Sequence, residues 1–110
     1  MKNFIQPGNV CTFTAPAGGV QSGDGFLAGS LFAVAAYNAD AGEEVEGSLV
    51  GVYELPKAGN ALAEGAKAYW DATAKNVTGT ASGNKLIGAC IRAAGVADAS
   101  ARIRLDGTAI

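Results

Sequence analysis

The sequence predicts an all-β protein, and three observations support this fold class. Short apolar stretches recur about every ten to fifteen residues, which is the spacing of strands in β-barrels and β-sandwiches. Residues that favour turns, chiefly Gly, Pro, Asn and Asp, separate these stretches. The chain shows no alternation of strands with helices. We therefore expect a compact β-barrel or β-sandwich of about seven or more strands, with at most one or two short helical turns.

The length and composition indicate one small domain. The chain has 110 residues, the size of a single domain, and 49% of them are hydrophobic. Alanine accounts for 23 residues, so large apolar side chains are fewer than that percentage suggests. We expect residues 1–9 to form an N-terminal arm or edge strand and residues 10–110 to form a single β domain. Because the core is small, association with further copies or a partner would add buried surface.

The charge pattern argues against nucleic acid as a partner. The chain carries eight Lys and Arg against ten Asp and Glu, and its basic residues are scattered instead of clustered. The apolar runs fall short of the roughly 18 residues of a membrane span, and the N-terminus lacks the apolar stretch of a signal peptide. We therefore expect no membrane partner and a soluble protein that stays where it is made.

The sequence offers little for catalysis or metal binding. Histidine is absent, which removes the commonest general base and most zinc sites. Glu43, Glu44 and Glu46 could hold a divalent cation, but no second set of oxygen ligands lies nearby, so a solvated turn is preferred. Residues 23–28 match the spacing of a dinucleotide-binding loop, but further turn residues follow where a helix is required. We expect no enzymatic activity, no metal and no cofactor.

The stretch 45–57 is the longest that resembles a single strand. Its odd-numbered positions from 49 to 55 are apolar, and Val50 and Val52 make most of the opposite face apolar as well. A strand that is apolar on most of both faces is typical of the centre of a sheet. Pro56 cannot donate a hydrogen bond to a neighbouring strand, so the strand should end there.

The remaining elements are predicted by the same reasoning. Further strands are expected at residues 10–15, 31–37, 66–72, 77–80, 86–94 and 100–105. Asn60 and Gly65 could cap a single helical turn between them. Trp70 is the only tryptophan and is expected to be the largest anchor of the core. The alternative for this residue is a carbohydrate-stacking platform with Tyr53 and Tyr69.

The N-terminal arm supplies the candidate contact residues. Phe4 and Ile5 are two large apolar side chains, and Pro7 begins a Pro-Gly-Asn break before the first expected strand. A segment this short becomes ordered when it joins a sheet edge or docks in a groove of a partner. Phe4, Ile5 and Pro7 are therefore candidates for a contact with a partner or a further subunit, with an edge strand inside the same domain as the alternative.

Six segments, in order over nearly the whole chain, carry a resemblance to a known family. They are TAPAGGVQSG (14–23), LFAVAA (31–36), VGVYELPK (50–57), EGAKAYWDA (64–72), GNKLIGACIRAA (83–94) and ARIRLDG (101–107). Together they resemble the small capsid cement, or head decoration, proteins of tailed bacteriophages and prophages, formerly a domain of unknown function. The ELPK segment, the YWD triplet and the following GN-x-L-I-G step carry most weight.

The resemblance implies a structural head protein that binds the outer surface of the assembled capsid and stabilises it. Its partner would be the phage major capsid protein, and it would lie on the virion surface after synthesis in the bacterial host cytoplasm. The family implies a homo-oligomer, a trimer first, with a dimer or a monomer as alternatives, and it offers no catalytic residues or cofactors. The alternative from a different class is a β-barrel module that binds a small ligand or carbohydrate.

We predict that Cys11 and Cys90 are unbridged thiols that bind no metal. Both lie in strand-like apolar contexts, and the chain has neither a CxxC motif nor a histidine. Thiol titration of the denatured protein without reductant should therefore find both thiols free. Finding no free thiol would contradict this and indicate a disulfide.

Overall fold

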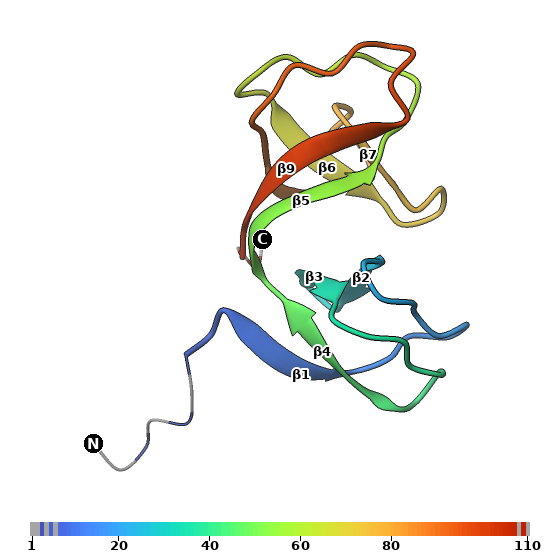
Figure 1. The fold of residues 1–110 in the computed structure, drawn as a ribbon, viewed down its shortest axis with the longest axis vertical. Coiled ribbons are helices and arrows are strands. Elements are labelled where there is room, and N and C mark those ends of the chain that lie inside the picture. Colours follow the sequence, from blue (N-terminus) through green and yellow to red (C-terminus); the bar gives the residue numbers. More distant parts are fainter. Residues whose placement is uncertain (1–2, 4, 6, 108, 110) are drawn as a thin grey trace.

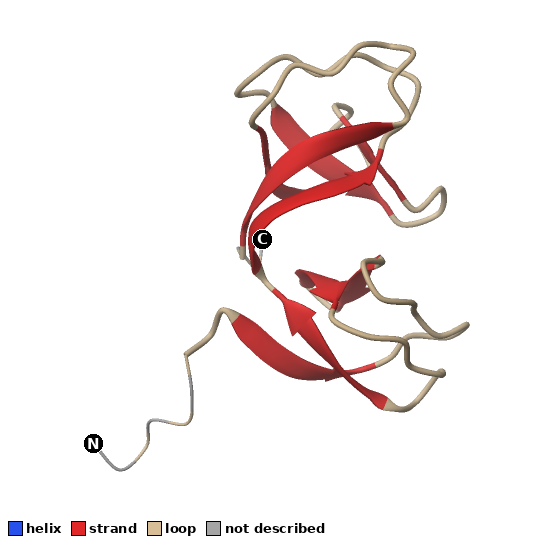
Figure 2. Cartoon of the chain, viewed as in Figure 1, coloured by secondary structure: helices blue, strands red, loops and turns tan. Residues whose placement is uncertain are grey.

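The computed structural model describes residues 3, 5, 7–107 and 109, and it confirms the all-β fold class. Figure 2 shows the described chain as strands joined by loops, without a helix in that part. The strands are β1 (Val10–Thr14), β2 (Gly25–Ala28), β3 (Leu31–Ala35), β4 (Glu44–Ser48), β5 (Val50–Pro56), β6 (Lys67–Asp71), β7 (Asn76–Thr78), β8 (Lys85–Cys90) and β9 (Ser100–Asp106).

The strands form two antiparallel sheets that follow one another along the chain (Figure 1). The first sheet has four strands in the order β1-β4-β3-β2, and the second has five in the order β5-β9-β8-β6-β7. The second sheet curls into a half-barrel, because its edge strands β5 and β7 approach each other. Lys57 bridges Val77 there, and the N–H of Ala58 donates to the carbonyl of Val77 over 2.8 Å. The curl shields part of both edges from other chains.

The stretch 45–57 is two strands in two sheets, so the prediction of one central strand is wrong. Leu49 separates β4 from β5; its N–H donates to the carbonyl of Asn9 over 2.8 Å, and its side chain is buried in the four-stranded half. β5 then lies at an edge, with Val50 37% and Val52 51% exposed. The prediction failed because apolar side chains on both faces do not ensure that both faces are covered.

β3 is the strand that joins the two halves of the molecule. Phe32 and Val34 point into the larger core, which the five-stranded sheet supplies, and Ala33 and Ala35 point into a second, smaller core. All four are buried. The prediction of an interior strand over 31–37 is therefore confirmed for β3, and this strand belongs to two cores at once.

Each core is centred on a pair of aromatic rings. Phe32 and Trp70 pack with their ring centroids 4.9 Å apart across the larger core, and Trp70 is 4% exposed. The prediction of Trp70 as a core anchor is confirmed. In the smaller core, Phe13 meets Phe26 edge-on at 5.9 Å. Both distances fall in the range in which aromatic pairs stabilise beyond their buried area.

The predicted helical turn between Asn60 and Gly65 is not formed. Leu62 instead lies in an extended bridge, because its N–H and carbonyl both bond to Ala94, over 2.9 and 2.8 Å. The buried side chain of Lys57 fixes the start of this loop, since its Nζ donates to the carbonyl of Asn60 over 2.8 Å. These long-range hydrogen bonds outweigh the local preference for a cap.

We predict that Trp70→Ala lowers the free energy of unfolding by about 3 to 5 kcal/mol, because it leaves a cavity against Phe32 where the two halves meet. Ile91→Ala, at a side chain that is 40% exposed, is the control and should cost about 1 kcal/mol or less. Chemical denaturation of both variants measures the difference. Equal costs would contradict a role for Trp70 in joining the two halves.

Candidate interaction surfaces

The described part of the chain directly ahead of β1 leads away from the two sheets, as Figure 1 shows. Ile5 is 85% exposed and Pro7 is also exposed, whereas Phe4 lies outside the described residues. Just before β1, the carbonyl of Asn9 accepts the hydrogen bond from the N–H of Leu49. The apolar side chain of Ile5 is therefore accessible to another molecule.

The outer face of the five-stranded sheet exposes aliphatic and charged side chains, with Asp106 opposite Val50 and Arg104 opposite Val52. The strand register places Lys67, Ala89, Arg104 and Val52 in one row across β6, β8, β9 and β5. We call this row the arginine face. Val52 is 51% exposed, and Val50 beside it is 37% exposed. Neither Arg104 nor Lys67 forms an ion pair within the described part of the chain.

The neighbouring position on this sheet carries an ion pair. Arg102 Nη2 lies 3.0 Å from Glu54 Oε1, and Ser100 Oγ donates to the other carboxylate oxygen over 3.3 Å. The hydrogen bond from Arg102, its positive charge and the bond from Ser100 hold the pKa of Glu54 below its ordinary value. The ion pair stabilises the folded state above the ordinary pKa of Glu54, and this stabilisation is lost as the pH falls through the lowered pKa. It is small because solvent reaches both side chains, which are 40% exposed for Arg102 and 59% for Glu54.

The outer face of the four-stranded sheet is acidic. Glu44 and Glu46 of β4 lie opposite Thr14 and Thr12 of β1, and Val10 continues the same face. We call these five residues the glutamate face. All five are exposed, and neither glutamate forms an ion pair within the described part of the chain.

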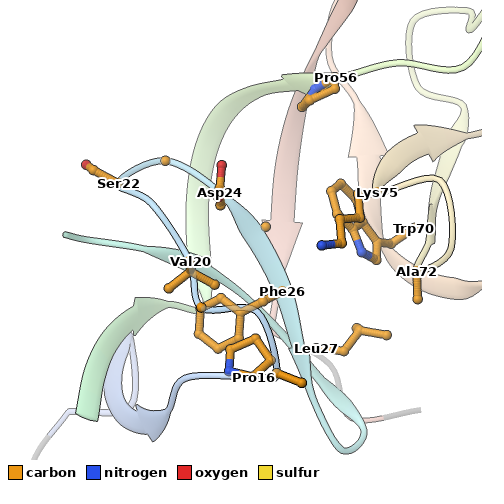
Figure 3. Close-up of a pocket in the computed structure, with 14 residues that line it drawn as sticks. Pro16, Val20, Ser22, Asp24, Phe26, Leu27, Pro56, Trp70, Ala72 and Lys75 are labelled. Carbon is orange, nitrogen blue, oxygen red and sulfur yellow. The ribbon is translucent and has the colours of Figure 1, made fainter. Parts of the chain in front are cut away.

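A cavity of about 430 Å³ lies between the two halves of the molecule. One wall comes from the loop after β1 and from β2, and the other comes from the end of β5, the end of β6 and the turn between β6 and β7. Figure 3 shows Pro16, Val20 and Phe26 on the first wall and Pro56, Trp70 and Ala72 on the second. The cavity is mainly apolar, with Lys75 as its basic residue.

The other sequence-predicted sites do not come together. Glu43 is exposed and accepts a hydrogen bond from the N–H of Asp40 over 2.9 Å, so it closes a turn as the solvated interpretation requires. Trp70 and Tyr69 point to opposite faces of β6, and Tyr53 packs against the larger core. The three aromatic residues therefore do not form one stacking platform.

The glycine-rich segment 23–28 leads into β2, as the turn interpretation requires. Gly23 has a φ of +88°, and its N–H donates to the carbonyl of Ala35 over 2.8 Å. Cys11 and Cys90 are both free thiols; Cys90 is buried and Cys11 is half-buried. Among the described residues, no group of three His, Cys, Asp or Glu side chains could hold a metal ion.

Sequence reasoning missed the arginine face and the cavity. The alternation over 50–54 placed Val50, Val52 and Glu54 on one face, and the presence of Glu54 there was a signal that this face meets solvent. The cavity had no comparable signal, because its walls come from segments about thirty or more residues apart that meet only after folding.

The structure is that of a small β protein that presents exposed apolar and charged surfaces to other molecules. Residues 5–105 match the family model described as phage cement protein. The chain belongs to the phage cement protein family. Searches among curated proteins and among solved structures found no match.

The family defines a structural protein of bacteriophages that associates with the capsid in a cement, or decoration, role. This agrees with the sequence resemblance, which covers the same part of the chain. In the described residues, no helix is long and apolar enough to cross a membrane.

Proposed function

We propose that the protein binds the outer surface of the assembled capsid through the major capsid protein and stabilises the shell. The observation that carries the proposal is the family match over residues 5–105. The exposed side chain of Ile5 in the arm supplies surface for such a contact. Purified protein mixed with heads that lack it should co-sediment with them and raise the temperature at which they release DNA.

The proposed role is structural and not enzymatic, because a shell is reinforced by binding alone. A protein that joins neighbouring capsid subunits adds contacts that must break before the shell opens. We further propose synthesis in the bacterial host cytoplasm, with neither nucleic acid nor membrane as a partner. The net charge of −2 supports the exclusion of nucleic acid.

We also propose a division into an N-terminal arm, residues 1–9, and a single β domain, residues 10–110. The exposure of Ile5 and Pro7 and the start of β1 at Val10 support this boundary. Phe4, Ile5 and Pro7 remain the proposed contact residues of the arm. The two cores that share β3 support a single domain over the rest of the chain.

Self-association is the next prediction. The core is small and rich in alanine, and aliphatic side chains on the arginine face remain exposed, so a symmetric oligomer would bury surface that the monomer leaves in water. We expect a trimer, with a dimer or a monomer as the alternatives. At a protein concentration on the order of tens of micromolar, the mass measured by light scattering should exceed the monomer mass of 10.9 kDa. A mass equal to the monomer would contradict association in solution.

We predict that deleting residues 2–6 abolishes binding to undecorated heads while the thermal midpoint and the oligomer stay nearly unchanged. The deletion removes Ile5, which is 85% exposed and contributes little to the fold. Ile5→Asp in the full-length chain is the matched point variant and should weaken binding in the same assay. A truncated protein that binds heads as well as the full chain would exclude the arm from the contact.

A further inference from the structure

The charges of this chain are divided between its two sheets. Residues 10–48, which hold the four-stranded sheet, contain five acidic side chains and no Lys or Arg. Residues 50–107, which hold the five-stranded sheet, contain seven basic and five acidic side chains. The small net charge of −2 therefore hides two halves of opposite sign.

The glutamate face has nothing within its own sheet to neutralise it. Glu44 and Glu46 are two positions apart on one strand, so their carboxylates stand on the same side about 7 Å apart along the backbone. Their neighbours Thr12 and Thr14 carry no charge. Repulsion between these like charges would fall if a cation from another molecule lay against them.

The arginine face is the complementary surface. Arg104 lies between Val52 and Ala89, so its guanidinium emerges from small aliphatic neighbours. Lys67 adds a second cation beyond Ala89 in the same row. Arg104 forms no ion pair with another described residue, and an arginine beside exposed aliphatic side chains is a composition found at the centre of protein interfaces.

We propose that copies of the chain associate head to tail, with the arginine face of one copy against the glutamate face of the next. The inference rests on the self-association proposed above and specifies its interface. Arg104 would pair with Glu46, and Val52 would contact the exposed Val10. A contact between two different faces of the same protein closes into a ring when the rotation between copies permits it.

Charge favours this contact over one between two identical faces. Two arginine faces laid together would bring Arg104 of each copy toward the other's cations, and two glutamate faces would do the same with Glu44 and Glu46. Like charges opposed across an interface are strongly unfavourable, whereas opposite charges also steer the encounter. The capsid could supply a cation for the glutamate face instead, and the experiment distinguishes that occupant.

The test is a charge reversal with its compensating partner, measured by sedimentation across a range of protein concentrations at low salt. Arg104→Glu and Glu46→Lys should each raise the dissociation constant of the oligomer by about tenfold or more. The double variant should return it to near the wild-type value. Lys75→Glu and Glu64→Lys make the same charge changes on exposed turns and should leave it unchanged. Thermal midpoints of all variants confirm folding.

Each outcome decides the inference. Single reversals that leave the oligomer intact, or a double variant that stays dissociated, would overturn the contact while self-association stands. A wild-type chain that is monomeric would overturn both, and co-sedimentation with undecorated heads would then test the cement role by itself. Glu46→Lys that abolishes head binding without changing the oligomer would assign the glutamate face to the capsid.

Discussion

The contact between Phe32 and Trp70 is the interaction on which the rest of the structure depends. Phe32 belongs to the four-stranded sheet and Trp70 to the five-stranded sheet, and their rings meet 4.9 Å apart. Because β3 also sends Ala33 and Ala35 into the smaller core, this one strand ties both hydrophobic clusters together. The two sheets are joined along the chain only through Leu49, and Phe32 and Val34 of β3 give the pair a shared interior.

Glycine makes both aromatic contacts possible in a chain with few large side chains. A Cβ at Gly25 would lie 2.6 Å from Phe32 and 3.0 Å from Trp70, and a Cβ at Gly47 would lie 3.1 Å from both Phe13 and Phe26. Each ring pair therefore occupies space that any other residue would fill. Many of the other apolar residues are alanines, which fill little space. The aromatic rings that pack directly against glycine therefore supply much of the close packing in the two cores.

The small size of the two cores also determines which apolar side chains remain exposed. Two small cores use the inward residues of the sheets and leave Val50, Val52 and Ile5 in contact with solvent. A cement protein functions through its surface, because its role is to associate with the capsid. The arm, the arginine face and the glutamate face are separate surfaces, so contact with the capsid and contact between copies need not compete for the same residues.

The sequence by itself determined the fold class, the approximate position of most strands and the burial of Trp70. These features depend on neighbouring residues: apolar side chains alternate along a strand, and turn-forming residues separate one strand from the next. The family followed from the order of its segments, and the exposed arm residues Ile5 and Pro7 were found from a Pro-Gly break. Only the tertiary structure decided that the stretch 45–57 changes sheets at Leu49, because the N–H of Leu49 donates its hydrogen bond to the carbonyl of Asn9, forty residues earlier in the chain. It also decided which faces remain open, because strand pairing, and not local pattern, brings Lys67, Arg104 and Val52 into one row.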